Sequence, residues 1–417
     1  MRLRVLILVV GLILLFPTFI AAQDNNSERC EALNQEGGLL YQQARYSDAL
    51  EQFQQANTCY RETNDREGEG KTLYNIGSIY SSLGQYESAL DYYQQALSIA
   101  QEIDNRAGEG ATLNNIGFIY ANLGQYEQAL EYYQQSLSID QEIGDREGEG
   151  TTLNGIGGIY ASLGQYEQAL EYYQQSLSIR KKIGDRRGEG ATLNNIGFIY
   201  ASWGQYEQAL EYYQQSLSIQ KEIGDREGEG ATLNGIGGIY DSLGQYEQAL
   251  EYYQQSLSIR KEIGDREGEG RTLNNIGFIY DSWGQYEQAL NYLQQSLTIL
   301  QEIGDRAGEE TTLNNIGLVY ANLGQYKQAF DYYQQNLSVA QEIGDRAGEG
   351  ATLNNIGVIY GNLGQYKQAL DCYQQSLSIR KEIGDREGVG ATLSNIGGIY
   401  DSWGQYEQAL EYYQQSL

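Results

Sequence analysis

Histidine is absent from the chain, and proline and methionine each occur once. Without histidine, no Ser-His-Asp triad, no Cys-His pair and no histidine metal site can form. The single proline, Pro17, lies close to the N-terminus, so no proline interrupts a helix in the rest of the chain. We therefore expect a helical protein that is not an enzyme and that holds neither a cofactor nor a metal ion.

Basic residues are also scarce. The sequence has 27 Lys and Arg against 56 Asp and Glu, which gives a net charge of -29 at pH 7. Such a charge repels the phosphates of nucleic acids and the headgroups of anionic lipids. We expect no nucleic acid partner, and we interpret the excess acid mainly as solvated surface.

The N-terminus has the order of a secretory leader. Basic residues in MRLR precede an apolar run over residues 5–16, and small residues follow at AAQ. We predict a signal peptide over 1–22 and repeats that are exported to the periplasm or the cell exterior. Ile20 departs from the small residue preferred before a cleavage site, so an uncleaved membrane anchor through residues 5–22, with the repeats outside the cytoplasm, remains the alternative. Only that alternative predicts contact with a membrane.

One sequence motif is repeated along the rest of the chain with a period of 40 residues, which is typical of a repeat architecture. We expect a degenerate first repeat, or N-terminal cap, over 28–63, followed by nine units over 64–417, the last of them incomplete. The repeat is followed most easily through one tyrosine column: Tyr46, Tyr86, Tyr126, Tyr166, Tyr206, Tyr246, Tyr286, Tyr326, Tyr366 and Tyr406.

Each unit contains two apolar patterns with helical spacing. Ile156 and Gly157 belong to the buried stripe of a first helix, and Ala169 and Tyr173 belong to that of a second. Asp185 follows the second helix after a single glycine and can cap the next unit. Because such short connections force neighbouring helices to pack antiparallel, the sequence predicts an all-α solenoid of about ten helix-turn-helix repeats.

The motif L-x2-I-G-x2-Y with G-x-Y-x2-A-x3-Y, as in residues 113–133, resembles the tetratricopeptide repeat. The resemblance implies a right-handed superhelix with a concave, ligand-facing side. The 40-residue length and the GDR-x-GEG segment resemble the extended repeats of kinesin light chains and Partner of Inscuteable adaptors. Near-identical exported arrays resemble cyanobacterial and other bacterial tetratricopeptide proteins, some of which carry a CHAT peptidase domain.

Three glycines in the LNGIGGIY segment, residues 153–160, need separate explanations. Gly157 belongs to a column that is glycine in all ten units, and we predict that the two helices of a unit approach each other closely there. Gly155 and Gly158 belong to columns that vary, and both lie on the face that the resemblance makes ligand-binding. Two interpretations stay open: each glycine pair forms a pocket walled by phenylalanines, or the phenylalanines fold into the gaps. The phenylalanines are Phe118, Phe198 and Phe278.

Asparagines form another column on the same face. In several tetratricopeptide proteins, including the O-linked sugar transferase, the matching position carries an asparagine ladder that holds a peptide backbone, which an amide can do through its donors and acceptor. The alternative is that these amides cap or brace neighbouring helices. The predicted peptide-binding asparagines are Asn75, Asn115, Asn195, Asn275, Asn315, Asn355 and Asn395.

Two further predictions concern acidic and sulfur-containing side chains. Asp241 and Asp281 replace small residues on the same face, and we include them among the candidate peptide-binding residues because they could receive a basic ligand group, although surface acids are usually only solvated. Cys30 and Cys59 should reach the same height in the first helix pair, where they form either a disulfide that locks the N-terminal cap or two buried thiols.

We therefore predict a non-catalytic scaffold that binds an extended peptide or partner segment in the groove. The alternative is that the repeats are the sensory part of a larger effector, such as a CHAT-type peptidase. The sequence stops within a second helix at Leu417, which predicts an uncovered apolar edge and self-association through it, unless the chain continues.

Overall fold

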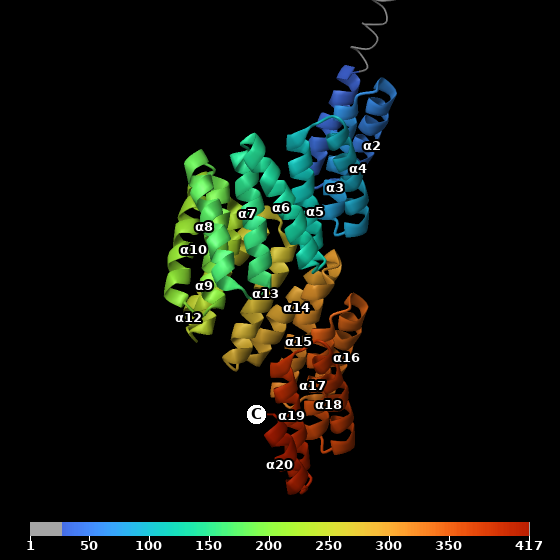
Figure 1. Cartoon of the computed structure of the whole chain (residues 1–417). Helices are drawn as coiled ribbons and strands as arrows, with labels where there is room; N and C mark the ends of the chain where they lie inside the picture. The colour runs from blue at the N-terminus through green and yellow to red at the C-terminus, as the bar shows by residue number, and fades with distance from the viewer. Residues whose placement is uncertain (1–26, 417) are drawn as a thin grey trace, which may run out of the picture. The chain divides into compact units, whose positions relative to one another are not determined.

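The computed structural model describes residues 27–416 of the chain. Every regular element in this range is an α-helix, and pairs of helices follow one another along the chain (Figure 1). The all-α, repeated helix-turn-helix fold is therefore confirmed. The predicted signal peptide over 1–22 lies outside the described residues. Among the helices that the structure does describe, none is long and apolar enough to span a bilayer.

Each repeat consists of an A helix and a B helix. The first A helix covers residues 27–42. The other A helices are α3 (Arg66–Ser82), α5 (Arg106–Asn122), α7 (Arg146–Ser162), α9 (Arg186–Ser202), α11 (Arg226–Ser242), α13 (Arg266–Ser282), α15 (Arg306–Asn322), α17 (Arg346–Asn362) and α19 (Arg386–Ser402). The B helices are α2 (Tyr46–Thr63), α4 (Tyr86–Glu102), α6 (Tyr126–Ile143), α8 (Tyr166–Ile183), α10 (Tyr206–Ile223), α12 (Tyr246–Ile263), α14 (Tyr286–Ile303), α16 (Tyr326–Ile343), α18 (Tyr366–Glu382) and α20 (Tyr406–Gln415).

The turns between repeats use the glycine and aspartate that the sequence indicates. Gly144 has φ 74° after α6, a left-handed conformation that glycine adopts without steric cost. The next residue, Asp145, accepts a hydrogen bond from the backbone N–H of Gly148 (2.9 Å) and caps α7. The helical spacing that contains Ile156 and Gly157 predicts that Leu163 also lies on the buried stripe, which is wrong, because Leu163 follows the end of α7 and is exposed.

Two contacts build the core. Within a repeat, the invariant glycine of the A helix faces a B-helix aromatic ring: a Cβ atom added to Gly157 would lie 2.8 Å from Cδ1 of Tyr173. The predicted close approach is therefore confirmed. Between repeats, Ala129 and Tyr133 of α6 pack against Ile156 and Ile159 of α7. Within each compact unit, A helices contact the B helix before and the B helix after them, as α7 contacts α6 and α8, so the core continues from repeat to repeat there.

The chain divides into two compact units, the first ending at Gln205 and the second beginning at Tyr206. The first unit contains the helices up to α9, and the second contains α10 to α20. Within each unit, consecutive helices pack side by side (Figure 1). The sites described below each belong to one unit.

The first repeat carries a covalent link. The structure joins Cys30 of the first A helix to Cys59 of α2 through a disulfide, with Cα atoms 5.4 Å apart. Cys30 is fully buried beside Ala56 and Tyr60. The bridge therefore connects the two helices of the repeat that the sequence analysis describes as an N-terminal cap.

Candidate functional site: the A-helix face

Each A helix has a face that takes no part in the apolar core, which we call the A-helix face. In α5 it includes Asn115 and Phe118, whereas Leu113, Ile116 and Ile119 are buried against the B helices. This division follows from helical geometry, since residues three and four positions apart share one side of a helix. Repetition of α5 at 40-residue intervals places the predicted site residues of every repeat on equivalent surfaces.

The phenylalanines of the A-helix face remain open to solvent. Phe118, Phe198 and Phe278 have 48%, 56% and 38% of their surface exposed. The interpretation in which they fold into neighbouring gaps and close the surface is therefore wrong. An exposed aromatic ring offers a ligand apolar surface whose burial is favourable. The role of these phenylalanines in peptide binding stays a prediction.

The two variable glycines differ from each other. A Cβ atom on Gly155 would lie 2.7 Å from Cζ of Tyr133, and the same holds for Gly235 and Tyr213 (2.8 Å). The preceding repeat's tyrosine fills these positions, so the prediction that both glycines of a pair leave an empty site is wrong there. At Gly158 the nearest atom is Oη of Tyr173, 3.7 Å away, so this position is open.

The asparagine column makes contacts between neighbouring repeats. Nδ2 of Asn315 donates to Oδ1 of Asn274 at 3.0 Å. Each of the other predicted peptide-binding asparagines donates an equivalent bond to a side chain of the preceding repeat. The pairs are Asn75 with Asn34, Asn115 with Tyr74, Asn195 with Asn154, Asn275 with Asn234, Asn355 with Asn314 and Asn395 with Asn354. This geometry is the bracing that the sequence analysis left as an alternative.

Bracing uses only part of each amide. An asparagine side chain has two N–H donors and one acceptor oxygen. Nδ2 of Asn115 donates to Oη of both Tyr74 and Tyr93, whereas Nδ2 of Asn315 donates to Asn274, and in these bonds the acceptor oxygen of Asn115 or Asn315 is not used. Asn115 and Asn315 are half-buried, so each keeps part of its side chain at the surface. The asparagines can therefore brace the repeats and still contact a ligand, but peptide binding by them stays a prediction.

The A-helix face has hollows in both units. In the first unit, a cavity of about 390 Å³ is lined by Asn115, Phe118, Tyr133 and Gly155, among other residues. In the second unit, a cavity of about 360 Å³ is lined by Asn275 and by the more polar side chains Arg271 and Thr311. The first cavity brings together an asparagine and a phenylalanine that the sequence analysis selected.

The aspartates occupy different environments. Asp281 is buried and accepts a hydrogen bond from Nδ2 of Asn322 in the next repeat (3.2 Å). Burial raises the pKa of Asp281, and the Asn322 bond partly opposes this rise. Burial also raises the pKa of Asp241, which is half-buried. Asp281 therefore helps to join two repeats, a role that its sequence position did not reveal.

A carboxyl pair in the second unit, formed by the buried Glu310 and the half-buried Asp345, was not predicted from the sequence. Glu310 stands where most repeats have glycine, and its carboxyl group lies against that of Asp345, the N-cap of α17. Burial, together with the charge of Asp345 and a hydrogen bond to it, raises the pKa of Glu310 to about 7. The signal in the sequence was the single replacement of the GEG glycine by glutamate.

This pair predicts a loss of stability as the pH rises. Between pH 4.5, the ordinary pKa, and about 7, the folded protein holds a proton on Glu310 that the unfolded chain has released. The free energy of unfolding should therefore fall by about 1 to 3 kcal/mol across this range. Glu310→Gln should remove that fall and stabilise the protein at pH 8, as measured by urea unfolding at several pH values. If Glu310→Gln and a control at exposed Glu147 (Glu147→Gln) have the same pH profile, the carboxyl pair is not the cause.

Antiparallel helix pairs stacked in sequence, with one helical face left outside the core, define an α-solenoid. A family model described as "Tetratricopeptide repeat" matches residues 28–102, 109–182, 188–262, 229–302, 308–382 and 350–417. The chain belongs to the tetratricopeptide repeat family, as the sequence motif predicts. A search of the curated proteins found no match.

Solved structures support the same fold. A STAND signal-transduction ATPase with a tetratricopeptide repeat sensor from Pyrococcus horikoshii has a TM-score of 0.61 and 16% identity, over 83% of this chain and 52% of that chain. The quorum sensor NprR from B. thuringiensis has a TM-score of 0.55 and 17% identity, over 81% of this chain and 97% of that chain. A Rap protein complexed with competence and sporulation factor has a TM-score of 0.55 and 16% identity, over 76% of this chain and 99% of that chain. At these identities the likeness concerns the fold alone.

Proposed function

We propose that this protein is a non-catalytic scaffold that binds an extended peptide segment of a partner protein along the A-helix face. The observation that carries the proposal is that the A-helix face of each unit, which the core does not use, carries exposed phenylalanine together with half-buried asparagines. Asparagine amides can pair with the backbone of an extended chain whatever its sequence, and apolar side chains can select among sequences. One surface thus offers both requirements of peptide recognition.

The cavity around Phe118 supports this proposal in the first unit. Its volume of about 390 Å³ lies within the range of ligand sites, and its lining combines aromatic rings with amide and hydroxyl groups. The amides of Asn114 and Asn115 lie beside the rings of Phe118 and Tyr133 in this lining. A side chain of the peptide would enter the cavity while its backbone meets the amides.

Charge supports a protein partner rather than a nucleic acid. With a net charge of -29, the chain repels polyphosphates, whereas a peptide with basic residues is attracted. The half-buried Asp241 contributes a carboxyl group to the A-helix face of the second unit, whereas Asp281 is buried and bonded to Asn322. We further propose that the leader over 1–22 directs the repeats out of the cytoplasm.

A sensory role within a larger effector is the second candidate. The Pyrococcus protein, described as a signal-transduction ATPase with a tetratricopeptide repeat sensor, combines such repeats with other domains in one chain. A CHAT-type peptidase would be one such effector. The peptide-binding face would serve both functions. Determining whether the reading frame continues beyond Leu417 into an effector domain would distinguish them.

The scaffold proposal predicts that filling the A-helix face abolishes peptide binding. Gly158→Phe introduces the side chain that Phe118 and Phe198 carry at the same position. A Cβ atom there would make only an ordinary contact of 3.7 Å with Oη of Tyr173, so the fold should accept it. Peptides selected from a random phage-displayed library on residues 23–417 should bind Gly158→Phe at least tenfold more weakly, as measured by isothermal titration calorimetry.

The matched control is Gln174→Phe, which adds the same ring at an exposed position of the B helix α8. This variant should bind the selected peptides as the unmodified protein does. Equal affinities of all three proteins would place the binding elsewhere and reject the A-helix face. Failure to select any peptide would reject the proposed function.

A further inference from the structure

Near the N-terminal end of each A helix, one A-helix residue faces one B-helix residue, and the sizes of these two side chains determine how the space between them is occupied. One is the second glycine of the GEG segment, such as Gly110 in α5, and the other is a B-helix residue thirty positions later, such as Asp140. A Cβ atom on Gly110 would lie 3.0 Å from Oδ1 of Asp140, so the two positions share one space. A small residue at one position is therefore compatible with a large residue at the other.

Other repeats fill this space with a side chain. Leu300 fills it opposite Gly270 and is 1% exposed, and Asp140 is buried and accepts a hydrogen bond from Oγ1 of Thr152 (3.0 Å). Where the B-helix residue is the small Ala340, the A helix carries Glu310 in place of glycine. These exchanges show that a side chain usually occupies the space between the two positions. The seventh repeat keeps a hollow of about 360 Å³ beside Leu300, but its lining includes the polar side chains of Arg271, Asn274 and Thr311.

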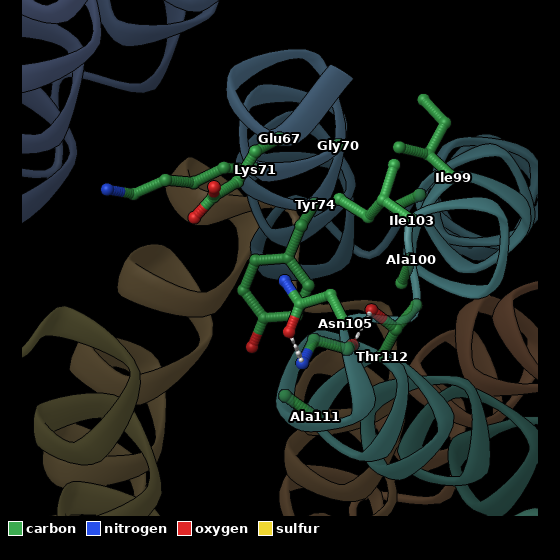
Figure 2. A pocket seen from close by; sticks show the side chains of 12 residues that line it. Glu67, Gly70, Lys71, Tyr74, Ile99, Ala100, Ile103, Asn105, Ala111 and Thr112 are labelled. Atoms are coloured by element: carbon green, nitrogen blue, oxygen red, sulfur yellow. Dashed lines mark hydrogen bonds between the residues drawn. The ribbon is translucent and has the colours of Figure 1, made fainter. Parts of the chain in front are cut away.

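The second repeat is different, because both of its residues are small. Gly70 faces Ala100, a pair that no other repeat has at these positions. The result is a cavity of about 260 Å³ between α3, α4 and α5, which we call the Ala100 cavity (Figure 2). Its lining includes Tyr74, Ile99 and Ile103.

Two other replacements make the walls of the Ala100 cavity apolar. Ala96 stands where most repeats have a serine such as Ser136, whose hydroxyl group donates to the carbonyl oxygen of Gly110 (2.9 Å). Tyr74 stands where most repeats have an asparagine. Ala96 removes a hydroxyl group and Tyr74 replaces an amide by an aromatic ring, and both changes occur in the repeat that also has Gly70 opposite Ala100.

The shape of the cavity is already formed without a ligand. Oη of Tyr74 accepts a hydrogen bond from Nδ2 of Asn115 (2.9 Å), and the Tyr74 and Tyr93 rings lie 5.7 Å apart. Figure 2 shows the Tyr74 ring between the side chains of Ile99 and Ile103 on one side and that of Lys71 on the other. The ring therefore forms a fixed wall of the cavity.

Size and polarity limit what the cavity can hold. About 260 Å³ exceeds the roughly 150 Å³ of a cavity known to bind benzene, and it falls below the roughly 300 Å³ at which sites for drug-sized ligands begin. Ile99, Ile103 and Ala100 offer no partner to a charged group, whose burial would be costly. Glu67 and Lys71, also in the lining, carry opposite charges, so they do not favour an ion of either sign.

We propose that the Ala100 cavity binds one uncharged apolar side chain, of the size of phenylalanine or leucine, from the bound peptide. This inference rests on the proposed function, because it takes the ligand to be a peptide lying on the A-helix face. Asn115 connects the two sites, since it hydrogen-bonds Tyr74 and also lines the cavity around Phe118. The Ala100 cavity would thus determine which residue the peptide carries at one position.

Ala100→Leu tests the cavity directly. Leucine occupies the equivalent position in the seventh repeat, as Leu300 opposite Gly270, so the fold accepts this residue. Toluene, which has the ring of a phenylalanine side chain, should bind saturably to the unmodified protein in ligand-observed NMR titrations. It should bind at least tenfold more weakly to Ala100→Leu and normally to the control Ala347→Leu, which makes the same change at an exposed position. Absence of saturable binding, or equal binding to all three proteins, would overturn the proposal.

A second measurement separates this proposal from the proposed function. Peptides selected on the unmodified protein should carry an aromatic or large aliphatic residue at one shared position, and their affinity should fall at least tenfold with Ala100→Leu. Peptides that bind both proteins equally would overturn the proposal that the Ala100 cavity binds a peptide side chain, but they would leave the scaffold function intact. If toluene binds as expected but no peptide can be selected, the proposed function fails and a cavity for a small apolar molecule is what remains.

Discussion

Replacing Gly157 by leucine is expected to lower the free energy of unfolding by about 3 kcal/mol, although leucine is a much better helix former than glycine. The reason is space. A Cβ atom at this position would already lie 2.8 Å from Cδ1 and Cε1 of Tyr173, whose ring is buried and 4% exposed. The side chain would have to push apart the two helices of the repeat, or displace the ring. Urea unfolding followed by circular dichroism measures the loss.

The neighbouring glycine provides a matched control. Gly158→Leu makes the same substitution one residue later, where the nearest atom to a new Cβ is 3.7 Å away and where the eighth repeat has Leu318. It should be neutral, or stabilise the protein by up to about 1 kcal/mol through the gain in helix propensity. Equal destabilisation by both leucines would show that these glycines serve the flexibility of the helix rather than the approach of Tyr173.

Loss of the Cys30–Cys59 disulfide is expected to destabilise the first repeat by roughly 3 to 4 kcal/mol. The bridge closes a loop with a sequence separation of 29, and the cost follows from the chain entropy that this loop loses in the unfolded state. In a repeat protein, stability is a sum of local terms, so the effect should remain near the N-terminus. The double variant Cys30→Ser, Cys59→Ser should show faster amide hydrogen exchange in residues 27–63 than in later repeats.

Two measurements control this experiment. Cys372→Ser removes the remaining cysteine, which is free and half-buried, and should leave exchange in the first repeat unchanged. Titration of the denatured, unreduced protein should find one free thiol. Three free thiols would contradict the bridge, and unchanged exchange in the double variant would show that packing alone holds the first repeat together.

The repetition explains why so much of the fold could be predicted. Each repeat position occurs about ten times, so equivalent positions can be compared within one sequence. The comparison distinguishes a position that is always glycine, such as Gly157, from one that varies, such as Gly158. The period of 40 and the helical spacing of apolar residues gave the helix pairs, and the Gly-Asp sequence gave their boundaries. These are local properties, which depend on backbone conformation and on the pattern of burial.

The site was predicted less completely, because its details depend on contacts between repeats. Gly155 looked as open as Gly158, but the Tyr133 ring of the preceding repeat fills it. The asparagines matched a peptide-binding ladder, yet each also donates to the repeat before it, as Asn315 does to Asn274. No periodicity within one helix indicates how far a side chain of the next helix reaches.

The sequence by itself determined that this protein is an array of helix pairs, where its helices begin and end, and which face of each A helix stays outside the core. Only the tertiary structure decided which positions on that face are empty. The Ala100 cavity is bordered by Gly70 and Ala100, two small residues thirty positions apart that face each other, and its lining includes Tyr74, Ile99 and Ile103. An empty space depends on the volumes of all the side chains that surround it, and those side chains come from three helices brought together by folding.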